Sequence, residues 1–221
     1  MDRLLHLDER EIEIVLGSLT LNGTLSLPQG ATGLVMFVHG SGSSRFSSRN
    51  RYVAQTIGTA HLATLLFDLL SQEEEEIDQI TAELRFDIGL LTERVTRVTS
   101  WLRQNNDTKA LTIGYFGAST GAAAALAAAA EVDKIGAVVS RGGRPDLVEE
   151  LLPQVTAPTL LIVGGNDGPV IDMNRRAFLQ LLTTKEMKIV PGASHLFEEP
   201  GALEEVARLA TEWFRRYLAA A

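Results

Sequence analysis

A serine stands between two glycines where an apolar segment gives way to an alanine-rich one. Residues 117–121 read Gly-Ala-Ser-Thr-Gly, after an expected strand (111–116) and before an expected helix (122–130). In a sharp strand-to-helix turn the central residue is strained, and flanking glycines leave room for the close approach of the chain. The turn presents the serine at a helix N-terminus, where backbone N–H groups face incoming negative charge. The pattern predicts that Ser119 is a nucleophile.

A serine hydroxyl needs a base to act as a nucleophile, and a histidine and an aspartate follow it in the chain. Asp167 comes just after the apolar run 158–163, and His195 lies on the loop after the run 187–190. Because the carboxyl ends of parallel strands share one edge of a sheet, these side chains are expected to converge there. The order Ser, Asp, His predicts a catalytic triad in which His195 is the general base and Asp167 orients it. Asp172 is a rival acid, although a helix N-terminus also explains it.

Each of these residues also has a purely structural explanation. Ser119 would then lie in a turn that only packs a strand against a helix. His195 would be a loop histidine bonded to backbone, and Asp167 would cap a turn or a helix. The three residues together, in the required order, favour the catalytic interpretation.

Two groups of arginines lie near the same expected edge. Arg141 and Arg144 follow an apolar run, and Arg49 stands with Arg45 and Arg51 around an expected helix start, where cations oppose the helix dipole. Either group can bind a carboxylate or phosphate of a substrate. The composition favours a plainer explanation, in which either group is a solvated face or pairs with the acidic run at positions 73–76. Arg141 and Arg144 are carried forward as candidate substrate contacts.

Composition excludes several classes of protein. The chain has 221 residues, a net charge of −8 and no cysteine. An acidic balance argues against nucleic-acid binding, and the missing cysteines exclude disulfides and a thiol nucleophile. The four histidines show no metal-binding spacing, so we expect no metal and no cofactor. No segment suits a signal peptide or a membrane span, which predicts a cytoplasmic protein, either monomer or homodimer.

Apolar runs alternate with segments of helical period along the whole chain, which predicts an α/β fold. We expect a single domain over residues 1–221. Its mostly parallel central sheet should have about eight strands, with helices on both faces and no large lid. Asn22-Gly23 is expected to be a turn or a bulge, and Ser47 or Ser48 a helix cap. Strands are expected at 11–15, 19–27, 33–38, 62–67, 111–116, 135–139, 158–163 and 187–190, and helices at 49–59, 81–104, 122–130, 147–152, 169–182 and 203–218.

These motifs together resemble the α/β-hydrolase superfamily, and most closely its dienelactone hydrolase-like branch. The resemblance rests on His-Gly-Ser-Gly at 39–42, the 117–121 turn, the Asp167 turn and Gly-Ala-Ser-His at 192–195. The chain departs from dienelactone hydrolase in its nucleophile, a cysteine there and a serine here, which argues against dienelactone as the substrate.

The oxyanion of an acyl-transfer reaction needs two N–H donors. The backbone N–H of Thr120, directly after the nucleophile, is the first. The resemblance implies that the backbone of Ser41 is the second, with Gly42 as its neighbour near the substrate.

The leading hypothesis is a serine hydrolase that cleaves small or short-chain carboxylic esters through an acyl-enzyme. An acyltransferase or thioesterase would use the same triad. A non-catalytic binding module on the same fold is the alternative from another class.

Overall fold

Eight strands form one sheet in the order β1-β2-β4-β3-β5-β6-β7-β8 in a computed structural model that describes residues 9–218. β1 and β2 pair antiparallel to their neighbours, and the pairs from β4 to β8 are parallel. The sheet is therefore mostly parallel, as predicted. The strands are β1 (Glu9–Leu16), β2 (Leu19–Ser26), β3 (Gly33–Val38), β4 (Ala63–Phe67), β5 (Thr112–Ala118), β6 (Ala137–Arg141), β7 (Thr159–Gly164) and β8 (Lys185–Val190).

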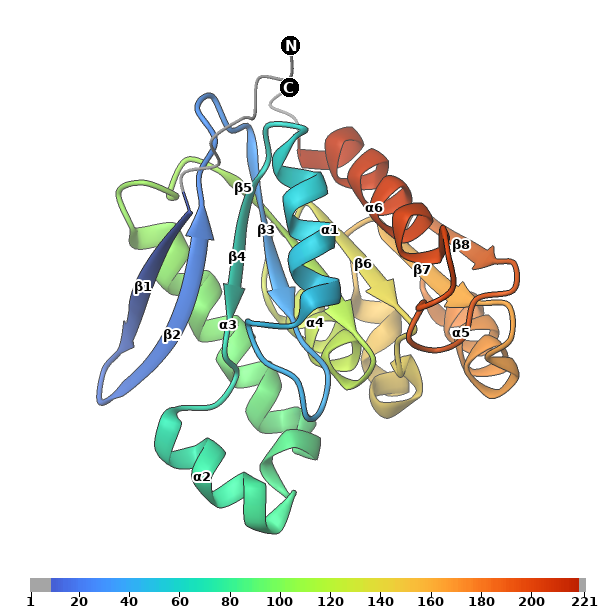
Figure 1. The fold of residues 1–221 in the computed structure, drawn as a ribbon, viewed down its shortest axis with the longest axis horizontal. Coiled ribbons are helices and arrows are strands. Elements are labelled where there is room, and N and C mark those ends of the chain that lie inside the picture. Colours follow the sequence, from blue (N-terminus) through green and yellow to red (C-terminus); the bar gives the residue numbers. More distant parts are fainter. Residues whose placement is uncertain (1–8, 219–221) are drawn as a thin grey trace.

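Helices cover both faces of this sheet (Figure 1). Helices α1 and α6 pack together on one face, while α3, α4, η2 and α5 cover the other. No helix within residues 9–218 is long and apolar enough to cross a bilayer. The helices are α1 (Ser48–Gly58), α2 (Gln72–Thr81), α3 (Ile88–Gln104), α4 (Thr120–Glu131), α5 (Gly168–Gln180) and α6 (Ala202–Leu218), with the 3₁₀ segments η1 (Leu84–Phe86) and η2 (Pro145–Gln154).

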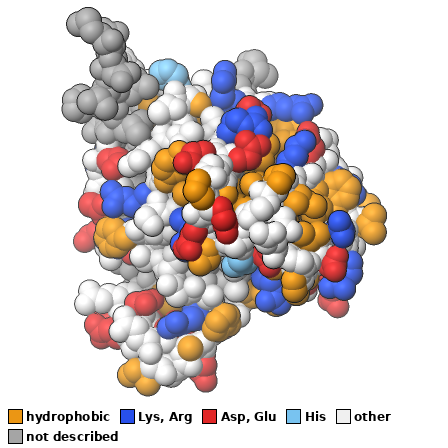
Figure 2. All heavy atoms as spheres, turned by 45° about the vertical axis from the view of Figure 1, so that its right-hand side comes forward, with side chains coloured by type: hydrophobic (Ala, Val, Ile, Leu, Met, Phe, Trp, Pro, Cys, Tyr) orange, Lys and Arg blue, Asp and Glu red, His pale blue; other side chains and the backbone are white. Residues whose placement is uncertain are grey.

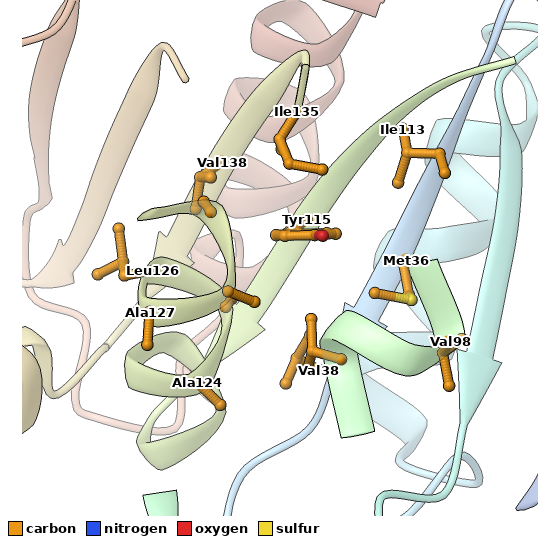
Figure 3. Packing of buried hydrophobic residues seen from close by; sticks show 14 of the residues in the cluster. Met36, Val38, Val98, Ile113, Tyr115, Ala124, Leu126, Ala127, Ile135 and Val138 are labelled. Carbon is orange, nitrogen blue, oxygen red and sulfur yellow. The ribbon is translucent and has the colours of Figure 1, made fainter. Parts of the chain in front are cut away.

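The core under α4 shows why its alanine-rich sequence suits this position. Ten of its residues are buried, and the small side chains let the helix lie close to β5 (Figure 3). Tyr115 fills the space between α4 and α3, and its hydroxyl is 2.7 Å from Thr99 Oγ1. Burial raises the pKa of Tyr115, so the phenol stays protonated and its hydroxyl remains a satisfied core group. This packing fixes the end of β5 relative to the start of α4.

Charges of both signs are mixed on the side of the molecule that carries α6 and β8 (Figure 2). Arg208 pairs with Glu205 and Glu212, and Arg216 pairs with Glu186. Because opposite charges neutralise one another locally, this face presents no large patch of one sign.

Two expected features differ in the structure. Asn22-Gly23 lies inside β2, in unbroken register with β1, because the turn is made by Gly17 at positive φ. The long helix expected at 81–104 is divided. Ala82 ends α2 in the left-handed conformation, and the side chain of Asp87 caps α3 through the N–H of Leu90.

The acidic run at positions 73–76 opens helix α2. Ser71 and Glu74 form a capping box, and acidic side chains in a first turn suit the helix dipole. Glu74 also pairs with Arg94 rather than with the arginines near the active edge. Together α2 and η1 form an excursion between β4 and α3 that extends beyond the carboxyl edge of the sheet (Figure 1).

Candidate active site

Ser119 occupies a strained turn between β5 and α4. Its backbone angles are φ 52° and ψ −121°, a conformation that side-chain-bearing residues rarely adopt. A Cβ on Gly117 would lie 2.4 Å from the Cα of Ala122, and one on Gly121 would lie 2.3 Å from the carbonyl oxygen of Val38. Only glycine fits at either position, so the turn requires the spacing found in the sequence.

Ser119, His195 and Asp167 form a continuous chain of polar contacts. His195 Nδ1 is 2.6 Å from Asp167 Oδ2, and His195 Nε2 is 3.3 Å from Ser119 Oγ. Because an ionised carboxylate only accepts, the imidazole Nδ1 carries a hydrogen and donates it to Asp167. In the neutral ring Nε2 is then free to accept from the serine hydroxyl. The rival acid Asp172 lies elsewhere, in an exposed pair with Arg175.

The loop that carries His195 is held by residues to which the sequence reasoning gave no role. Asn166 donates its backbone N–H to Ala193 O at 2.9 Å and its side-chain N–H to Gly192 O at 2.8 Å. Glu199 accepts the backbone N–H of Ser194 at 3.0 Å, which lowers the pKa of that carboxyl. The Asn166 bonds join the loops after β7 and β8, and the Glu199 bond holds the second loop, so together they set the distance between the acid and the base. The position of Asn166, directly before Asp167, was the only available signal.

The loop after β3 lies against the serine turn. A Cβ on Gly40 would be 3.1 Å from the Cβ of Ser119. His39 keeps the loop in place, since Leu69 N–H donates to its Nε2 at 3.2 Å and its Nδ1 then donates to Gly40 O at 3.0 Å. Burial lowers the pKa of His39, which favours the neutral ring that this arrangement needs.

The two expected oxyanion donors are neighbours in space, although 79 positions separate Ser41 from Thr120. The backbone N–H of Ser41 donates to Thr120 Oγ1 at 2.8 Å. In the resting structure the Ser41 amide is therefore engaged by the Thr120 side chain. Such an N–H can serve a second acceptor through a bifurcated bond. The side chain of Thr120 was not expected to take part, because only its backbone was considered.

We predict that Thr120→Val lowers kcat/KM for a small ester by about tenfold, less than the loss of a whole oxyanion donor. Valine keeps the shape but cannot accept from Ser41, so the loop loses the bond that aims its amide. Thr120→Ser keeps a hydroxyl and is expected to retain activity within about twofold of the parent protein. The measurement is steady-state kinetics on both variants. A faster Thr120→Val protein would mean that the hydroxyl competes with the oxyanion rather than positioning the amide.

Of the candidate substrate contacts, only Arg141 lines the pocket that contains Ser119, whereas Arg144 and Gly42 do not. Arg141 lies at the end of β6, is 8% exposed, and lines a pocket of about 250 Å³ that also contains Ser119 and His195. Arg144 instead makes two 2.8 Å bonds to Asp146, which raise the pKa of Arg144, and it is not among the residues lining that pocket. Gly42, at φ 67°, is exposed and likewise lies outside the pocket lining.

Arg45, just before α1, and Arg49, in its first turn, have different partners. Arg45 pairs with Asp68 and Glu11, whereas Arg49 lines the same pocket as Ser119.

Within residues 9–218 no group of three His, Asp or Glu side chains is arranged to hold a metal ion.

Known proteins are similar to this chain in sequence and in fold. Residues 28–219 match the model of the dienelactone hydrolase family. The crystal structure of dienelactone hydrolase from Anabaena variabilis is 61% identical in sequence, covers 96% of this chain and 99% of its own, and superposes with a TM-score of 0.95. A Mycobacterium tuberculosis protein named "Putative phosphoribosyl transferase Rv0571c" is 52% identical over 213 residues, 96% of this chain. That match spans 47% of the relative, so this chain corresponds to about half its length.

A more distant structure shares the fold alone. Est1E from Butyrivibrio proteoclasticus is 17% identical, with a TM-score of 0.79 over 94% of this chain and 98% of its own. The family match covers most of the chain, and the Anabaena structure agrees with it over nearly the full length. The chain therefore belongs to the dienelactone hydrolase family, within the α/β-hydrolase fold.

Proposed function

We propose that this protein is a serine hydrolase that cleaves small carboxylic esters through an acyl-enzyme on Ser119. The observation that carries the proposal is the continuous contact from Asp167 through His195 to a serine held at positive φ. A serine of purely structural use would gain nothing from that strain or from a base within 3.3 Å. Membership of a hydrolase family supports the same reaction class.

The proposed mechanism uses the contacts among Ser119, His195 and Asp167. As Ser119 Oγ attacks the acyl carbon, its proton passes to His195 Nε2, and Asp167 stabilises the resulting imidazolium. The N–H groups of Thr120 and Ser41 hold the negative oxygen. His195 then gives the proton to the departing alkoxide, which leaves as an alcohol. A water molecule deprotonated by His195 next attacks the acyl-enzyme and releases the acid, which restores the serine.

The size of the pocket supports a small acyl group. Its volume of about 250 Å³ lies below the usual range of ligand pockets, roughly 300–1,000 Å³. Hydrolysis of a thioester, or transfer of the acyl group to an acceptor other than water, would use the same residues, because each reaction begins with attack of Ser119 on the acyl carbon.

The test is pre-steady-state hydrolysis of p-nitrophenyl acetate, together with labelling by a fluorophosphonate probe. The expected result is a burst of nitrophenolate of about one equivalent per chain, and a probe adduct on the peptide that contains Ser119. Neither burst nor adduct in a folded protein would favour a non-catalytic binding module on the same fold.

A further inference from the structure

The outer edge of β8 presents backbone groups that no strand pairs. β8 ends the sheet (Figure 1), and among the residues that the structure describes β7 is the only strand beside it. Thr159 N–H donates to Thr184 O at 2.9 Å. Gly165 N–H donates to Val190 O at 2.8 Å, so the even-numbered residues of β8 direct their backbone groups toward β7. Because these groups alternate along a strand, the odd-numbered residues direct theirs outward, and they are Lys185, Met187 and Ile189.

The charges of β8 complement themselves when the strand meets a second copy. Glu186 and Lys188 lie on one face of β8, on either side of Met187, and their side chains are 40% and 47% exposed. In an antiparallel pair of β8 strands with a two-fold axis at Met187, Glu186 of each copy lies directly opposite Lys188 of the other. The axis thus produces two ion pairs between the copies from residues that now pair only within one strand, at 3.1 Å.

The same axis also matches the outward backbone groups. Met187 then faces Met187 of the second copy, and Lys185 faces Ile189, so all three residues with outward groups form hydrogen-bonded pairs. Glu186 and Lys188 form the intervening pairs without backbone bonds, in which opposite side chains lie closer together. The stem of Lys185 from the second copy would cover Ile189, an apolar side chain that is 42% exposed. An axis at Glu186 or Lys188 would instead place like charges face to face.

A groove beside this edge leaves room for side chains of a second copy. It encloses about 330 Å³ between β8 and α6, and both Glu186 and Lys188 line it. Arg208, on the α6 side of the same lining, is already paired with Glu205 and Glu212. Lys188 of a second copy would therefore meet the Glu186 carboxylate in a groove whose other charges are largely balanced.

The opposite edge of the sheet has no such match. β1 is the other edge strand, and its alternate residues Glu9, Glu11 and Glu13 are acidic. Antiparallel pairing of two β1 strands about Glu11 or Ile12 would place carboxylates opposite carboxylates, which is unfavourable. Charges usually protect a sheet edge from such pairing. Those of β1 do so, whereas those of β8 favour pairing with a second copy.

We propose that β8 is the interface of a homodimer, in which two copies join their sheets antiparallel about a two-fold axis at Met187. The two eight-stranded sheets then form one continuous sheet. Because the paired strands run in opposite directions, the carboxyl edges of the two copies lie at opposite ends, and the two Ser119 sites open away from each other. The dimer concerns a surface outside the Ser119 pocket and is independent of the proposed hydrolase function.

The first experiment is sedimentation of the parent protein from about 1 to 500 µM, a range that suits the weak association expected of a short edge. The expected result is a reversible equilibrium between monomer and dimer. Lys188→Glu places carboxylates opposite Glu186 on both sides of the axis, and should weaken the dimer about tenfold or more. Lys109→Glu is the control, because it makes the same change of charge at an exposed lysine between α3 and β5. A parent protein that stays monomeric, or equal effects of the two variants, would overturn the proposal.

A mixing experiment tests the position of the axis. Glu186→Lys places lysines at both charged positions, and Lys188→Glu places glutamates at both, so each variant repels itself. When the two variants are mixed in equal amounts, both cross-strand pairs join opposite charges, and the expected result is a heterodimer at concentrations where each variant alone is monomeric. Both positions are exposed, so circular dichroism should show that the variants are folded. A mixture that stays monomeric at concentrations where the parent protein is dimeric would overturn the proposed interface.

Discussion

Ser119→Ala is expected to lower kcat for p-nitrophenyl acetate by about a million-fold, to the residual rate of a site without a nucleophile. The change removes one oxygen atom at a half-buried position, so the fold should be unaffected. What disappears is the covalent step itself, since His195 Nε2 would have no hydroxyl to activate. The measurement is steady-state hydrolysis with enough enzyme to detect the residual rate, alongside circular dichroism to show that the variant is folded.

The matched control is Ser100→Ala. Ser100 is an exposed serine of α3 whose hydroxyl bonds to the carbonyl of Thr96, and it does not line the pocket that contains Ser119. It should retain the parent rate and the fluorophosphonate adduct, both of which the Ser119 variant should lose. A Ser119→Ala protein with near-normal turnover would refute the acyl-enzyme assignment.

Asp167→Asn is expected to lower kcat by about 10⁴-fold while leaving the fold in place. The carboxylate accepts a hydrogen from His195 Nδ1 at 2.6 Å and so leaves Nε2 free for the serine proton. An amide NH₂ facing Nδ1 would favour the other tautomer, in which Nε2 carries the hydrogen and cannot act as a base. The isosteric change thus tests orientation and charge without changing volume. The measurement is kcat for p-nitrophenyl acetate over a range of pH.

Asp172→Asn is the control, because this aspartate was the rival acid and lies in an exposed pair with Arg175. Its kcat should stay within about twofold of the parent value, since an exposed pair contributes little even to stability. A larger loss in Asp172→Asn than in Asp167→Asn would reverse the assignment of the acid.

Local sequence predicted most of the fold, because the strands and helices are specified by nearby residues. The serine turn shows both kinds of requirement: a Cβ on Gly117 would meet the nearby Ala122, whereas one on Gly121 would meet the carbonyl oxygen of Val38, distant in the chain but at the end of the neighbouring strand β3. The predicted helix boundaries were wrong where the apolar residues keep a helical spacing across a point at which the helix itself is interrupted. The apolar positions from 81 to 104 fit one helix, but the left-handed Ala82 and the cap at Asp87 interrupt it. Alanine seldom ends a helix in this way, so composition gave no warning.

Contacts between distant segments could be predicted only where a topological rule applied. The shared edge of a parallel sheet was enough to bring His195 and Asp167 toward Ser119. No such rule relates Arg49 to Arg141, 92 positions apart, or assigns Arg144 to Asp146 rather than to a ligand. The bond between the Ser41 amide and the Thr120 hydroxyl likewise depends on side-chain positions that periodicity does not specify.

The backbone conformation of Ser119 has a consequence for how this protein responds to selection. A non-glycine residue at φ 52° and ψ −121° is strained by about 1–3 kcal/mol, a sizeable part of the stability of an ordinary domain. Glycine adopts such angles with little strain. Selection for heat resistance alone would therefore favour glycine at position 119, whereas selection for turnover would retain serine. Directed evolution toward a more heat-stable protein must therefore screen for stability and turnover together, because the change to glycine that relieves this strain also removes the hydroxyl.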